Sequence, residues 1–88
     1  MSAIEFEQWW KEFMRYHIKD NDNGKSMMNE LKWTLNGYST KKRKSFINHL
    51  IVEKELEIAA ELIPKYGGIC QKVRLRLALL GNLIFTRK

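Results

Sequence analysis

Apolar side chains recur every three or four residues along much of the chain, which is the spacing of one face of an α-helix. The first such row consists of Phe6, Trp10, Phe13 and His17. Ser2 and Glu5 precede it with the spacing of a capping box, in which each side chain binds the other residue's backbone N–H. The pattern predicts a helix to about residue 19. The polar residues 20–24 predict a turn after it.

Two further helices are expected before residue 65. Ser26 can cap the first, whose apolar row is Met27, Met28, Leu31 and Leu35. It ends at Asn36 and Gly37, a pair that tolerates left-handed geometry. The next helix begins at Thr40 or at Ser45, and the pattern leaves both starts open. Its apolar row is Phe46, Ile47, Leu50, Ile51, Ile58, Ala59 and Leu62, and Pro64 is expected to close it.

The last segment fits two structures. A helical row runs through Ile69, Val73, Leu77, Leu80 and Ile84. Residues 73–79, however, alternate as in a strand, and Gly81 and Asn82 could turn a hairpin. We favour the helix because the run is rich in leucine. The prediction is therefore one all-α domain, residues 1–88, forming a small bundle of four helices. The alternative is three helices and a C-terminal β-hairpin, a winged-helix-like arrangement.

Composition narrows the functional classes. The 88 residues are 44% hydrophobic and 30% charged, with a formal net charge of +6 that favours anionic partners. A single cysteine permits no internal disulfide, and no apolar run reaches the roughly 18 residues of a membrane span. We therefore expect a cytoplasmic protein that does not bind a membrane. His17, His49 and Cys70 lack the spacing of metal ligands. No nucleophile motif or glycine-rich phosphate loop is present, so we expect no metal, cofactor, small-molecule substrate or enzymatic activity.

Four consecutive cations stand where the third helix would begin: Lys41, Lys42, Arg43 and Lys44. Cations in a first helical turn face the positive end of the helix dipole, so each costs on the order of 0.3–1 kcal/mol. A bound phosphate would reverse this cost. If the helix begins at Ser45 instead, the same four residues form a solvated loop that avoids it.

A helix, a short turn and a basic helix start resemble a helix-turn-helix unit in outline. The four cations would bind phosphates, Ser39 and Thr40 would add neutral contacts, and Arg43 could make a forked bond to guanine. The sequence thus predicts a non-enzymatic nucleic-acid-binding protein, for DNA rather than RNA. The alternative is a protein-interaction module, such as an inhibitor, immunity or adaptor protein, that docks an acidic partner surface.

Two apolar features bear on partners. Trp33 points nearly opposite Leu31 and Leu35, and we expect a neighbouring element to cover it; otherwise it is an anchor for a partner protein. The last segment carries a second apolar row at Leu75, Leu79 and Leu83. A helix that is apolar on two sides either lies in the centre of a bundle or forms half of a homodimer seam.

The remaining charges suggest an internal arrangement. Glu53, Glu57 and Glu61 form a row at helical spacing, as do Lys72 and Arg76. If the last helix folds back antiparallel, Lys72 should lie near Glu61 and Arg76 near Glu57. This pairing would leave the cations of residues 41–44 without an internal partner.

Overall fold

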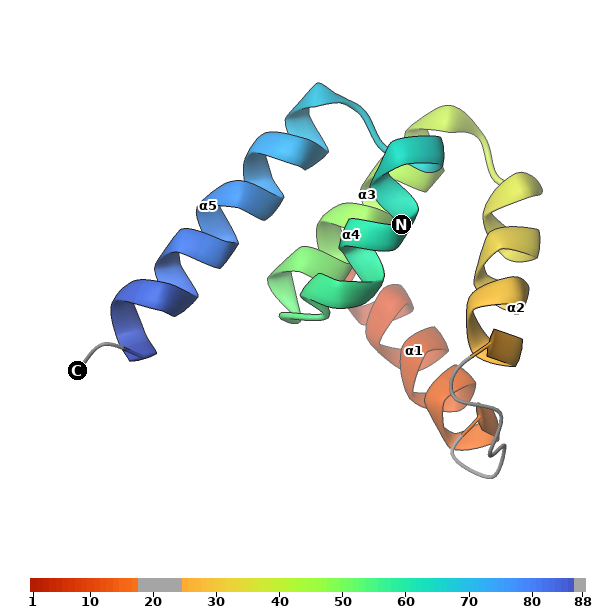
Figure 1. Ribbon diagram of the computed structural model, residues 1–88. Coiled ribbons are helices and arrows are strands. Elements are labelled where there is room, and N and C mark those ends of the chain that lie inside the picture. Colours follow the sequence, from red (N-terminus) through yellow and green to blue (C-terminus); the bar gives the residue numbers. More distant parts are fainter. Residues whose placement is uncertain (18–24, 87–88) are drawn as a thin grey trace.

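The computed structural model describes residues 1–17 and 25–86, which form five helices and no strand (Figure 1). The helices are α1 (Ala3–His17), α2 (Lys25–Asn36), α3 (Thr40–Val52), α4 (Leu56–Tyr66) and α5 (Ile69–Thr86). The all-α prediction is confirmed. The alternative with a C-terminal hairpin is wrong, because residues 69–86 form a single helix.

The helix count differs from the prediction because the third predicted helix is broken into α3 and α4. Lys54 adopts a left-handed backbone conformation with φ of 63°. Its N–H binds Ile51 O at 3.0 Å, and the N–H of Glu55 binds Leu50 O at 2.9 Å. These two bonds form a Schellman motif, which ends a helix. Glycine is the usual residue at the left-handed position, so a lysine gave no signal of the break.

Helix ends agree in part with the expected ones. The Glu5 N–H binds Ser2 Oγ at 3.1 Å, as in the capping box, and α3 begins at Thr40, the first of the two expected starts. Pro64 does not close α4, which continues to Tyr66. The expected end of the first helix at residue 19 and the turn over residues 20–24 lie outside the described residues. Ser26 lies within α2, which is described from Lys25.

The core is centred on α3, which packs against α1, α4 and α5. Phe46 is completely buried, with its ring centroid 5.2 Å from that of Phe6 and 5.4 Å from that of Trp9. His49 stacks on Phe6 with a centroid distance of 5.2 Å. Its Nε2 lies 3.0 Å from Met1 O. His17 is buried, and its Nε2 lies 2.7 Å from Glu30 Oε2, which joins α1 to α2.

Helix α5 is held to the body by the face that includes Gln71, Leu75 and Ala78. The buried Gln71 accepts a bond from the Gly68 N–H at 2.9 Å and donates one to Asn48 Oδ1 at 3.2 Å. In Figure 1 the C-terminal end of α5 stands away from the other helices. Among the described helices, none combines the length and apolar character needed to cross a membrane.

Candidate functional site

Two connections lie at the same end of the molecule (Figure 1): residues 37–39 between α2 and α3, and residues 67–68 between α4 and α5. The sequence has no Asp or Glu between Glu30 and Glu53, and none after Glu61. The chain therefore brings cations together here with few acids among them. We call this surface the basic end, and its members are Lys41, Lys42, Arg43, Lys44, Lys65 and Lys72.

Arg43 differs from the lysines because its guanidinium is used inside the domain. Its Nε donates to Leu35 O at 2.6 Å and its Nη2 to Asn36 O at 3.1 Å. These carbonyls belong to the last turn of α2, where backbone acceptors lack helical partners and the dipole is negative. The guanidinium also lies 5.7 Å from the ring centroid of Tyr66 on α4. Arg43 thus joins α2, α3 and α4, which leaves fewer of its donors for a partner.

The buried Tyr66 reinforces this junction. Its hydroxyl lies 3.2 Å from Lys32 O and 3.0 Å from Asn36 Oδ1, and it can donate to either. Two side chains from separate helices, Arg43 and Tyr66, therefore bind the end of α2, where Leu35 O also accepts a bond from the Tyr38 N–H at 3.1 Å. The position of the α2–α3 turn is fixed by these bonds.

The three lysines of the predicted cluster point in different directions around the first turn of α3. Lys41 is exposed to solvent, and Lys42 Nζ lies 4.3 Å from the ring centroid of Tyr38. The Lys44 side chain lies against the other connection, because a Cβ added to Gly68 would come within 3.3 Å of Lys44 Cε. Within the part of the chain that the structure describes, no carboxylate forms an ion pair with any of them.

Ser39 and Thr40 occupy the start of α3. The Ser39 hydroxyl accepts a hydrogen bond from the Lys42 N–H at 3.2 Å, so Ser39 is the N-cap of this helix. Thr40 is the first helical residue and is exposed. Both therefore lie beside the lysines, and the Thr40 hydroxyl has the freer position of the two.

The contribution of Lys65 and Lys72 to this surface was not predicted from the sequence. Lys65 follows Pro64 near the end of α4, and Lys72 begins the second turn of α5, with its N–H bound to Gly68 O at 3.1 Å. Lys72 was expected to pair with Glu61. Glu61 instead lies 3.7 Å from Lys32 Nζ on α2. Among residues 1–17 and 25–86, no ion pair joins α4 to α5, so this pairing hypothesis is wrong.

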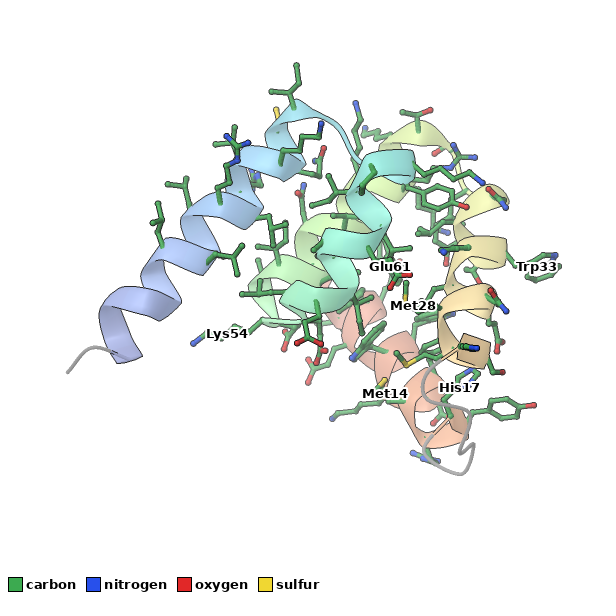
Figure 2. All side chains as sticks on the ribbon, in the orientation of Figure 1. Met14, His17, Met28, Trp33, Lys54 and Glu61 are labelled. Carbon is green, nitrogen blue, oxygen red and sulfur yellow. The ribbon has the colours of Figure 1, made fainter. Side chains whose placement is uncertain are left out.

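Trp33 lies beside the basic end and points away from the body (Figure 2). It is 78% exposed, so the expectation that a neighbouring element covers it is wrong. A hollow of about 580 Å³ adjoins it, lined by Trp33, Thr34, Asn36, Gly37 and Tyr38. Burial raises the pKa of the Tyr38 hydroxyl above its ordinary value. Trp33, Tyr38 and Lys42 form one continuous surface of two aromatic rings and a cation.

The other candidate residues do not gather into a site. Cys70, which would ordinarily be a small buried residue, is exposed. No group of three or more His, Cys, Asp or Glu side chains lies close enough to hold a metal ion, within the described ranges.

Comparison with known proteins finds no relative from which a function could be inferred. The chain matches no protein-family model, and no similar chain is found among the curated proteins or the solved structures.

Proposed function

We propose that the basic end binds the phosphate backbone of nucleic acid, with DNA as the preferred partner. The supporting observation is the arrangement of Lys41, Lys42 and Lys44 around one helix start without a carboxylate partner among the described residues. Lysine side chains in such a position bind phosphates and displace condensed counterions. Lys65 and Lys72 extend the same charge across the second connection.

The proposed mode is backbone binding with little base selectivity. Arg43 was the residue best suited to a forked bond with guanine, and two of its five N–H donors already bind Leu35 O and Asn36 O, which restrains the guanidinium at the end of α2. Lysine contacts to phosphate fix the position of a protein on DNA and carry no sequence information directly. Trp33 and Tyr38 could add stacking on an exposed base, which is tolerant of sequence.

Salt dependence of binding tests the proposal. Each lysine that neutralises a phosphate of duplex DNA contributes about 0.9 to the slope of log K against log salt. Changing Lys41, Lys42 and Lys44 together to glutamine should therefore lower the magnitude of this slope by about 2 to 3. The assay is fluorescence anisotropy with a short labelled duplex of mixed sequence, titrated at several salt concentrations.

A matched control changes Lys11, Lys25 and Lys54 to glutamine, which removes the same charge away from the basic end. This variant should keep a slope close to that of the wild type. Equal slopes for the two triple variants would overturn the proposal, because binding would then depend on net charge alone. Absence of DNA binding by the wild type at low salt would overturn it as well.

The exposure of Trp33 favours a second candidate, a protein-interaction module for an acidic partner. Exposed tryptophans beside a hollow are typical anchors at protein interfaces. In this case a partner captured from nuclease-treated lysate should no longer bind the variant Trp33→Ala. The triple glutamine variant should mainly slow its association. The nucleic-acid proposal expects instead that nuclease abolishes the capture.

A further inference from the structure

Helix α5 carries an apolar row that the domain does not cover. The row consists of Ile69, Val73, Leu77 and Leu80, and we call it the α5 row. Their exposed fractions are 81%, 49%, 63% and 56%. The helix is attached to the body through the other side, where Gln71 is buried and Leu75 and Ala78 pack against the core. These four members of the predicted row therefore share one outward face of α5, while the side chain of the fifth, Ile84, lies outside the described part of the chain.

The spacing of the α5 row is that of a helix–helix seam. Val73, Leu77 and Leu80 follow one another at intervals of four and three residues, and Ile84 continues the sequence pattern four residues later. Alternation of three and four is the heptad pattern of a coiled coil, in which each apolar side chain fits between residues of a partner helix. Leucine and valine at these positions suit pairing with a second copy of the same helix.

The charges of α5 favour one orientation of that pair. Lys72, Arg74 and Arg76 lie in its first half, residues 77–86 carry no charge, and Arg87 and Lys88 follow in the sequence. A parallel pair would bring the two sets of cations to the same level. An antiparallel pair places each set beside the uncharged half of the other helix, close to the negative end of its dipole.

We propose that the α5 row is the seam of an antiparallel homodimer, with the two-fold axis between Leu77 and Leu80. A lipid surface fits less well. Interfacial helices carry cations along their polar face, and here the second half of α5 has none. The α5 row contains no member of the basic end, and Lys72 bears only on the orientation of the pair, so dimer formation does not depend on the proposed function.

The expected dimer is reversible. With 18 residues, α5 is about 27 Å long. A single helix pair of that length buries less than the roughly 800 Å² per partner of a standard stable interface. The oligomeric state should therefore change with protein concentration.

Analytical ultracentrifugation of nuclease-treated protein over a concentration series tests the seam. Leu77→Glu should raise the dimer dissociation constant at least about tenfold, because it places a charge in the middle of the apolar contact. The matched control is Ile4→Glu, at an aliphatic side chain of similar exposure (68%) on α1. It should leave the dissociation constant unchanged. Changing Lys41, Lys42 and Lys44 to glutamine should leave it unchanged too, which separates this test from that of DNA binding.

The exposed Cys70 reports the orientation, because it is the sole cysteine of the chain. A nitroxide label on this thiol allows the distance between the two copies to be measured by pulsed electron paramagnetic resonance. Antiparallel pairing about the proposed axis separates the two positions by roughly 17 residues of rise, or about 25 Å. Parallel pairing would bring the two labels to the same level, and this result would overturn the orientation.

Three other results would overturn the seam itself. The first is a wild-type protein that stays monomeric at every concentration. The second is a dimer that Leu77→Glu and Ile4→Glu weaken equally. The third is a monomer that binds vesicles containing anionic lipid and loses this binding with Leu77→Glu, since the α5 row would then contact lipid.

Discussion

Replacing Arg43 with methionine removes every donor of the guanidinium while keeping a long side chain of similar helix propensity. The bond from Nε to Leu35 O is short, at 2.6 Å, and partly buried. A hydrogen bond to a charged group contributes about 1.5–3 kcal/mol. The second bond, to Asn36 O, is exposed and should contribute less. We expect Arg43→Met to lower the free energy of unfolding by about 2–4 kcal/mol.

The control is Lys41→Met, which removes the same charge from the same helical turn. Lys41 is exposed, so its replacement costs no internal bond and relieves an unfavourable dipole interaction of about 0.3–1 kcal/mol. Urea denaturation followed by circular dichroism gives both free energies. Thermal unfolding should show a fall of at least about 8 °C for Arg43→Met. Equal stability of the two variants would refute the internal role of Arg43.

Three further changes test other parts of the fold. Phe46→Ala should lower the free energy of unfolding by about 3–5 kcal/mol in the same urea assay, because it leaves a cavity among the rings that meet in the core. Lys54→Gly should raise the free energy of unfolding by about 0.5–1 kcal/mol. Glycine adopts the left-handed conformation without steric cost, and this gain exceeds the additional chain entropy that glycine loses on folding. Burial raises the pKa of Tyr38 above its ordinary value of 10.0, so the folded state disfavours the phenolate. The stabilisation that the neutral Tyr38 hydroxyl gives the folded state is complete below pH 10, and it is lost as the pH rises through the pKa of the folded state. Urea unfolding of the wild type and Tyr38→Phe should then show the wild type losing more stability above pH 10.

Local signals in the sequence predicted several apolar rows and the helix ends that depend on local capping residues. Ser2 and Glu5 marked the start of α1, and Asn36 and Gly37 marked the end of α2. These features depend on residues within one or two turns. The break at Lys54 could not be predicted in this way, because the left-handed residue is a lysine rather than the glycine that usually marks such a helix end.

The sequence predicted the main cations of the candidate site but not how the fold arranges them. Arg43 binds carbonyls seven and eight residues earlier in the chain, and only the angle between α2 and α3 brings them within reach. The exposure of Trp33 depends on which helices surround α2. Lys65 joins the lysines of α3 because α4 returns to the same end of the molecule. Each of these depends on tertiary packing, which the periodicity of a single helix does not contain.

The unfavourable position of four cations at one helix start now has a partial internal explanation. Arg43 belongs to the start of α3, where the positive end of the helix dipole repels its guanidinium. The guanidinium also binds the end of α2, where the negative end of that helix's dipole attracts it. The same bonds fix the turn that carries Lys41 and Lys42. Lys42 lies over the ring of Tyr38, which supplies a weaker compensation. Lys41 lies neither at the negative end of a helix nor over an aromatic ring. It is therefore the cation whose unfavourable interaction with the α3 dipole an external anion would best offset. Under the proposed function, we therefore expect the phosphate to contact Lys41 and Thr40 first.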